Sequence, residues 1–139
     1  MTGDRLSLEE AYLATTFRVE TPGGNIDIRI GEARPLLDRL LSKHKATEWA
    51  YITAWNPASR QLSADQNRLA QEELLRLIRD RGFAFYEGDG IPDQKGWISE
   101  RSVWIAGISR HEAGEMGRQF GQNAIVIGSL GGAAELLFL

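Results

Sequence analysis

Residues 49–57, Trp-Ala-Tyr-Ile-Thr-Ala-Trp-Asn-Pro, predict a buried strand that ends in a polar corner. The apolar run at the start of this stretch suits the interior of a sheet. Thr53, Trp55 and Asn56 carry hydrogen-bonding groups, which need partners wherever they are buried. Pro57 has no backbone N–H to give to a neighbouring strand, so the strand must end before it. We therefore expect a sheet that buries residues 48–54 and presents polar side chains where that strand ends.

Length and composition indicate one globular domain spanning residues 1–139. The chain is 42% hydrophobic and 25% charged, which is ordinary for a domain that buries its own core. No apolar run approaches the roughly 20 residues of a membrane span. The first ten residues lack the basic start and apolar centre of a secretion signal. We therefore expect a soluble, cytoplasmic protein that does not bind membranes.

The residue inventory narrows the possible chemistry. Because the chain has no cysteine, disulfides, thiolate nucleophiles and cysteine-bound zinc are excluded, and His44 and His111 are the only imidazoles. The carboxylates Glu87, Asp89 and Asp93 lack the spacing of a calcium-binding EF-hand loop. We expect no metal ion and no cofactor. The net charge of -3 and the pI of about 5.4 argue against general binding to nucleic-acid backbones.

Capping residues and apolar periodicity predict four helices. Ser7 with Glu10 and Ser63 with Gln66 both fit the capping box, in which a Ser side chain and a Glu or Gln three residues later satisfy each other's backbone N–H groups. Ser109 with Glu112 has the same spacing. Together with the leucine stripe that follows Pro35, these signals place helices at residues 8–16, 35–43, 64–80 and 109–120.

Apolar runs predict the strands, at residues 17–21, 25–30, 48–54, 83–87, around 103–105, 124–127 and 135–139. Residues 88–96 are rich in glycine and contain a proline, which indicates a loop. Helices alternate with strands along the chain, and such crossovers suit a mixed sheet with helices packed on it. We therefore predict a single α/β domain, a sandwich of one mixed sheet and about four helices.

Two groups of polar residues fall at element boundaries. Thr53, Trp55 and Asn56 lie at a strand end, where open α/β sheets commonly bind ligands. The same residues also suit core packing and a turn. Gln122 and Asn123 precede the last long strand. Their carboxamides can bind amide, base or sugar edges, and they can equally cap the preceding helix.

Glu100 is the best candidate for a functional carboxylate. If it is buried with a raised pKa, it could orient a ligand or act as a general base. Its neighbour Arg101 points to the opposite face of the strand, because side chains alternate along a strand. The alternative is an ordinary solvated glutamate.

Four pieces of sequence form one combined motif, namely Thr53-Ala54-Trp55-Asn56-Pro57, Asn67, Trp97-x-x-Glu100-x-Ser102 and Phe120-Gly121-Gln122-Asn123-Ala124. In this motif the chain resembles a bacterial family catalogued as domain of unknown function 3293, and the resemblance spans roughly residue 12 to the C-terminus. No activity is assigned to this family, so the resemblance implies a grouping and a set of positions that could converge. These positions are Thr53, Trp55, Asn56, Asn67, Glu100, Gln122 and Asn123.

We therefore expect a pocket for a small polar ligand, such as a nucleotide or a nucleobase. Trp55 would stack on the ligand while Asn56, Gln122 and Asn123 bond to its edges, and Glu100 would orient it or accept a proton. A hydrolase in which Glu100 activates water is also open. The alternative is a non-enzymatic protein-interaction module whose motif residues form a structural polar network. The sequence alone does not distinguish an enzyme from a binding protein. It does not give the oligomeric state either.

Overall fold

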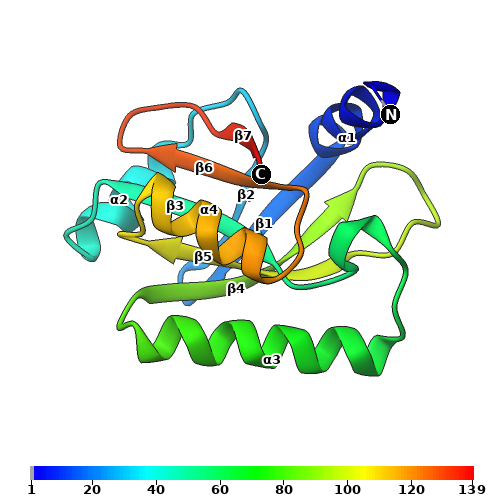
Figure 1. Cartoon of the computed structure of the whole chain (residues 1–139). Helices are drawn as coiled ribbons and strands as arrows, with labels where there is room; N and C mark the ends of the chain where they lie inside the picture. Colours follow the sequence, from blue (N-terminus) through cyan, green and yellow to red (C-terminus); the bar gives the residue numbers. More distant parts are fainter. Residues whose placement is uncertain (1) are drawn as a thin grey trace.

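The computed structural model describes the backbone of residues 2–139 and the side chains of residues 7–139. In this part of the chain, four α-helices and one short 3-10 helix flank a seven-stranded sheet (Figure 1). The strands are β1 (Thr15–Thr21), β2 (Gly24–Ile28), β3 (Glu48–Thr53), β4 (Ala84–Pro92), β5 (Glu100–Ala106), β6 (Ala124–Ser129) and β7 (Glu135–Phe138). The helices are α1 (Thr2–Leu13), α2 (Pro35–Lys43), η1 (Pro57–Ser59), α3 (Ala64–Asp80) and α4 (Arg110–Gln119). The α/β class and the four predicted helices are confirmed.

The sheet has the order β2-β1-β4-β5-β3-β6-β7, and every neighbouring pair is antiparallel. The expected helical crossovers do exist. Helix α3 joins β3 to β4 and helix α4 joins β5 to β6, and each pair runs in the same direction. In both cases another strand lies between the two. The sheet was predicted to be mixed, but all neighbouring pairs of its seven strands are antiparallel.

The sheet curls until its two edges meet. Within residues 2–139 the only parallel pairing is an isolated bridge between Ile30, just after β2, and Ala134, just before β7. Gly31 N donates to Ala134 O at 2.8 Å, and Ala134 N donates to Glu32 O at 3.1 Å. These contacts hold the β2 end of the sheet against the β7 end.

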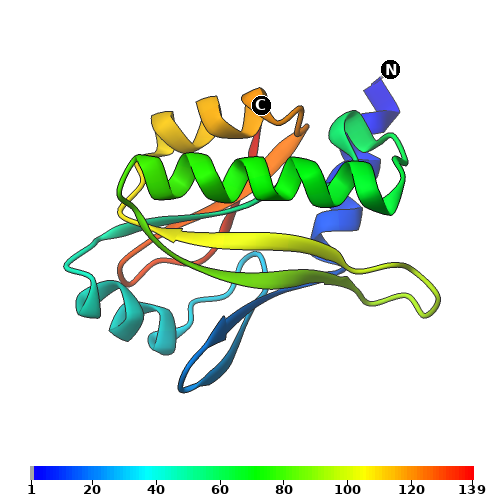
Figure 2. The ribbon, with the colours of Figure 1, turned by 90° about the horizontal axis from the view of Figure 1, so that it is seen from below.

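Apolar layers cover both faces of the sheet. Helices α3 and α4 lie side by side on one face, whereas α2 lies on the other (Figures 1 and 2). The first layer includes Ile52, Leu74, Ile78, Ile105 and Met116. The second includes Leu37, Leu40, Leu41, Trp49 and Trp104. Since each fully buried side chain of this kind contributes roughly 1.5–3 kcal/mol, the two layers fix the sheet between them.

The predicted starts of α3 and α4 are confirmed. Ser63 and Gln66 form the full capping box, with Gln66 N donating to Ser63 Oγ at 3.1 Å and Ser63 N donating to Gln66 Oε1 at 3.0 Å. Glu112 N donates to Ser109 Oγ at 3.1 Å. The same signal at Ser7 is wrong as a helix start, because α1 begins at Thr2.

The predicted loop at residues 88–96 is wrong for residues 88–92, because β4 continues through them to Pro92. Gly88 and Gly90 lie inside this strand, paired with β5 on one side. A Cβ atom on Gly88 would lie 1.6 Å from the carbonyl oxygen of Arg18. Gly88 therefore permits close approach of neighbouring backbones, and the loop is confined to residues 93–99.

Candidate functional site

A partly open cleft with a volume of about 630 Å³ lies at one end of the sheet. Its walls come from α1, from the starts of β1, β5 and β6, from the end of β3, and from the loop at residues 93–99. Figures 1 and 2 show α1, η1 and the β4–β5 loop gathered at this end. The cleft is lined by six of the seven candidate residues, namely Thr53, Trp55, Asn56, Glu100, Gln122 and Asn123.

Asn56 organises the corner after β3. Its backbone is left-handed, with φ 47° and ψ 60°, a conformation that Asn tolerates better than most residues. Its Oδ1 accepts from Leu62 N at 3.0 Å and from Asn67 Nδ2 at 2.8 Å. Its Nδ2 donates to Glu100 Oε2 at 3.0 Å. One side chain thus joins the corner, helix α3 and strand β5.

Asn67 lies behind the cleft and does not line it. It is only 2% exposed, and its Oδ1 accepts from the backbone N of Asn56 at 2.8 Å. One turn along α3, Gln71 is also buried, and its Oε1 accepts from Ala54 N at 3.2 Å. Sequence reasoning missed Gln71. The available signal was the spacing of four residues, which places both carboxamides on the apolar face of α3.

Glu100 faces the cleft with one oxygen unpaired. Its Oε2 accepts from Asn56, and its Oε1 has no hydrogen-bond partner within residues 7–139. Burial raises the pKa of Glu100, and the hydrogen bond from Asn56 partly opposes this rise. A carboxylate in such a setting can receive a proton or a donor from a ligand at a pH closer to neutral than an exposed one can.

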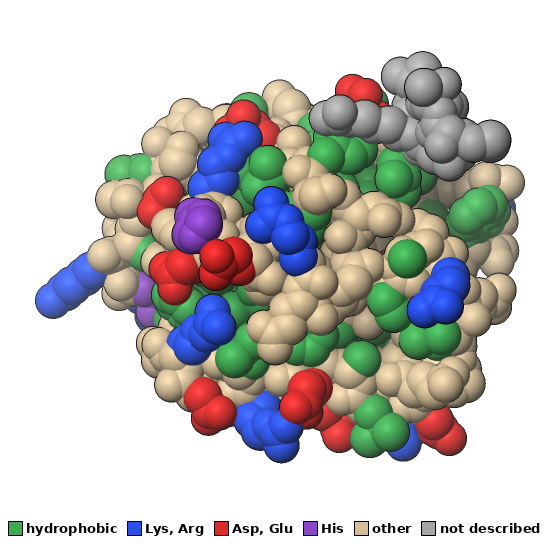
Figure 3. Space-filling view, in the orientation of Figure 1, with side chains coloured by type: hydrophobic (Ala, Val, Ile, Leu, Met, Phe, Trp, Pro, Cys, Tyr) green, Lys and Arg blue, Asp and Glu red, His purple; other side chains and the backbone are tan. Residues whose placement is uncertain are grey.

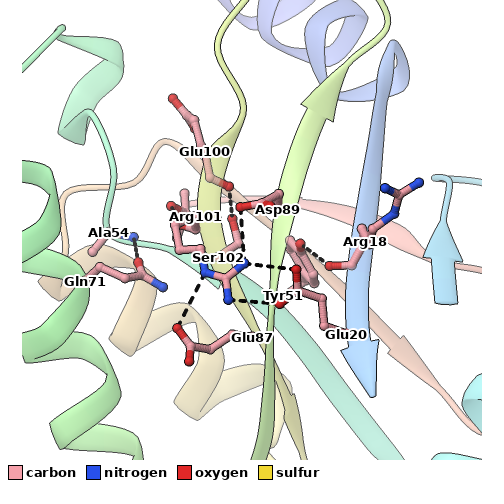
Figure 4. Close-up of polar contacts among 11 residues, drawn as sticks. Arg18, Glu20, Tyr51, Ala54, Gln71, Glu87, Asp89, Glu100, Arg101 and Ser102 are labelled. Atoms are coloured by element: carbon pink, nitrogen blue, oxygen red, sulfur yellow. Dashed lines mark hydrogen bonds and ion pairs between the residues drawn. The ribbon is translucent and has the colours of Figure 1, made fainter. Parts of the chain in front are cut away.

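Arg101 points away from Glu100, as strand alternation predicts. Its guanidinium contacts Glu20 at 2.9 Å, Asp89 at 3.4 Å and Glu87 at 3.6 Å (Figure 4). The ion pairs raise the pKa of Arg101, so this cation stays charged. Because these carboxylates already surround it, Arg101 does not neutralise Glu100 in the cleft.

Gln122 and Thr53 brace the same corner. Gln122 Nε2 donates to Trp55 O at 3.2 Å and to Phe120 O at 3.3 Å, so it caps the end of α4 and holds the strand end at once. Thr53 Oγ1 donates to Arg101 O at 2.7 Å and accepts from Trp55 N at 3.1 Å. Of the two uses expected for a carboxamide after α4, Gln122 shows the capping of the helix.

Trp55 and Asn123 complete the set of candidate residues. Asn123 Nδ2 donates to Ser59 Oγ at 3.0 Å. The indole N–H of Trp55 is buried and has no acceptor among the described residues. Buried unpaired donors are uncommon in proteins, and functional sites are one place where they occur.

Helix α1 supplies a wall that sequence reasoning missed. Tyr12 lies in this wall, and its hydroxyl donates to Ala124 O at 2.9 Å. Burial raises the pKa of Tyr12 to about 12, and the charge of nearby Glu100 adds to the rise. Across the cleft, the Tyr51 hydroxyl donates to Arg18 O at 2.7 Å (Figure 4). No local pattern links a tyrosine in the first helix to a strand more than a hundred residues later.

The loop at residues 93–99 forms an apolar lip. Trp97 and Ile98 line the cleft and are 65% and 73% exposed. Exposed apolar side chains on a loop beside a pocket are available for contact with a ligand or another protein. Of these two residues, Trp97 belongs to the family motif and Ile98 does not.

A second hollow of about 340 Å³ lies at the opposite end of β3, β4 and β5. Loop residues form most of its wall, and the ring of His44 there bonds to the Tyr86 hydroxyl at 2.8 Å. None of the candidate residues lies in it. The larger cleft is therefore the candidate site.

Charged side chains of the described residues do not gather into a second site. Cationic and anionic side chains are interspersed on the face seen in Figure 3. Among the described residues, no three His, Asp or Glu side chains are grouped so that they could hold a metal ion. No helix in this part of the chain is long and apolar enough to cross a membrane.

Comparison with known proteins gives a family and no function. The family described as "Protein of unknown function (DUF3293)" matches residues 52–125, more than half of the chain. The matched segment includes the corner after β3, Asn67, Glu100 and the Gln122-Asn123 pair. No curated protein and no solved structure matches the chain. The chain belongs to the DUF3293 family of proteins of unknown function.

Proposed function

We propose that the protein binds a small polar ligand with a flat ring in the cleft at the end of β3. The observation that carries this proposal is the convergence of Trp55, Asn56, Glu100 and Gln122, from distant parts of the chain, on one partly open cavity. A volume of about 630 Å³ falls in the range of small-molecule sites, which combine apolar walls with a few polar groups.

The walls support a ring-shaped ligand. Five aromatic side chains line the cleft, those of Tyr12, Phe17, Tyr51, Trp55 and Trp97. Such side chains bind the faces of heterocyclic rings by stacking. Glu100, which has an unpaired oxygen, would orient the polar edge of the ring. A nucleobase has this combination of a flat face and a polar edge.

A protein-interaction module is the second candidate. Its support is the network behind the cleft, in which Asn67 and Gln71 bond to backbone N–H groups and so act structurally. The exposed Trp97 and Ile98 would then form part of a surface for another protein. The two candidates differ in whether a small molecule alone occupies the cleft.

The test is a thermal-shift screen of nucleosides, nucleotides and small metabolites. A ligand at 100 times its dissociation constant should stabilise the fold by about 2.7 kcal/mol. The shift should fall in Trp55→Ala and persist in Glu48→Gln, a control at the opposite end of β3 where the side chain is exposed. A hit that survives Trp55→Ala would place the ligand outside the cleft.

A further inference from the structure

Among the described side chains, the cleft is lined by one carboxylate and no cation. Of the described side chains that line it, Glu100 is the only one with a formal charge at neutral pH, and none is Lys, Arg or His. Arg60 and Lys95 stand beside lining residues in the sequence, but both are exposed and neither lines the cleft. An anionic group placed in the cleft would therefore meet repulsion from Glu100 with nothing to neutralise it.

Most hydroxyl donors of the cleft are already used within the protein. Each hydroxyl has a single hydrogen, and five of the six described hydroxyls that line the cleft donate it to backbone carbonyl oxygens. The donors are Tyr12, Thr15, Tyr51, Thr53 and Ser102, at 2.9, 2.7, 2.7, 2.7 and 3.0 Å, whereas Ser59 accepts from Asn123. Gln122 likewise gives both hydrogens of its amide to the carbonyls of Trp55 and Phe120.

Two acceptor atoms of the described residues in the cleft remain free. Glu100 Oε1 and Gln122 Oε1 accept no hydrogen bond from the described residues, although both side chains line the cleft. Donors remain as well, among them the second amide hydrogen of Asn56 and the buried indole N–H of Trp55. A ligand that satisfies this arrangement must supply donors for the acceptors, because an unpaired polar group in a desolvated site is costly.

We infer, on the basis of the ligand site proposed above, that the cleft selects a flat aromatic or heterocyclic molecule that donates N–H groups and carries no phosphate or other anionic group. The donors would bond to Glu100 Oε1 and Gln122 Oε1, and the ring would lie between the aromatic walls. Amidines, aromatic amines and amino-substituted bases or nucleosides have this chemistry. Nucleotides do not, because of their phosphate.

Three probes that share a phenyl ring test the inference. Benzamidine is a cation with N–H donors, benzamide is neutral with N–H donors, and benzoate is an anion with none. Binding is followed by NMR through the indole N–H signals, of which the chain has four, one for each tryptophan. Benzamidine should shift the Trp55 signal at millimolar concentration and bind about tenfold more tightly than benzamide. Benzoate should leave the signal unchanged.

Adenosine and its 5′-monophosphate form a second matched pair, which differs only in the phosphate. Adenosine should bind more tightly than the monophosphate. Glu100→Gln keeps the size of the side chain and removes its charge, so it should weaken benzamidine binding about tenfold and change benzamide binding little. Glu48→Gln should change neither, and the amide spectrum of each variant reports whether its fold is intact.

The possible outcomes separate the inference from the proposed function. Benzoate or the monophosphate binding at the Trp55 signal as tightly as its uncharged or cationic partner overturns the inference but leaves a ligand site in place. Equal benzamidine affinity in Glu100→Gln also overturns it. No response of Trp55 to any of the five probes at millimolar concentration removes the ligand site itself, and the inference falls with it.

Discussion

Replacing Asn67 with Ala should destabilise the protein although Asn67 touches no part of the cleft. The side chain is 2% exposed and makes two hydrogen bonds to Asn56, each of 2.8 Å. Each bond is worth about 1 kcal/mol, and leaving the Asn56 N–H without a partner costs a further 1–3 kcal/mol or so. The better helix propensity of Ala returns roughly half a kcal/mol. We expect the free energy of unfolding to fall by about 3 kcal/mol.

Urea unfolding measures this loss, which corresponds to a fall in melting temperature of roughly 10 °C. Arg68→Ala is the matched control, because it lies next to Asn67 on the exposed face of α3 and should change stability by about 0.5 kcal/mol or less. Asn67→Ala should also weaken the binding of any cleft ligand, since Asn56 would lose the group that orients it. A loss of stability below about 1 kcal/mol would show that the Asn56–Asn67 pair does not hold the corner.

Three further predictions follow from the structure. Because burial raises the pKa of Glu100, the folded state disfavours the ionised form of this side chain. The penalty is relieved as the pH falls through the raised pKa. Glu100→Gln should therefore unfold at a higher urea concentration than the natural protein at pH 7, and the difference should shrink towards pH 4. Gly88→Ala would place a Cβ atom 1.6 Å from a β1 carbonyl oxygen, so calorimetry should show a loss of more than about 3 kcal/mol in the free energy of unfolding. Gly23→Ala is the control, because its Cβ would meet only one atom, at 3.9 Å, and it should change the free energy of unfolding little. Tyr12→Phe removes the hydrogen bond to Ala124 O and should lower the free energy of unfolding by about 1 kcal/mol. Because the pKa of Tyr12 in the folded protein is raised to about 12, the contribution of Tyr12 to stability is complete below about pH 10 and declines above it. The variant should therefore lose less stability between pH 10 and 12 than the natural protein.

Much of the fold could be predicted from local chemistry. The buried strand before Asn56 and the caps at Ser63 and Ser109 depend on residues close together in the sequence, and all three are confirmed. The order of the strands could not be predicted in this way. It depends on which strand enters between β3 and β4 and between β5 and β6, and this choice is made by long-range packing.

The errors in β4 and α1 have physical causes. Gly88 was assigned to a loop because glycine is commonest in turns, whereas here it allows the backbones of β4 and β1 to approach closely. Ser7 was assigned to a helix start because its spacing to Glu10 fits a capping box, but the helix runs through it. In both cases a residue type has two uses, and only its neighbours in space distinguish them.

The candidate site could be predicted as a set of residues but not as a shape. Six of the seven candidate side chains line the cleft. Asn67 was grouped with them, although it supports Asn56 from behind. Tyr12 was missed because only the folded chain brings α1 to the starts of β5 and β6.

The bridge between Ile30 and Ala134 has a consequence for how the protein behaves in a crowded solution. Exposed strand edges invite strands from other molecules to add to them, and short edge strands limit this association. Here the edge strands β2 and β7 have five and four residues, and the bridge occupies backbone groups just beyond one end of each. Changes at Ala134, which is 3% exposed, would free those groups. Self-association and precipitation, more than unfolding, are then the expected defects.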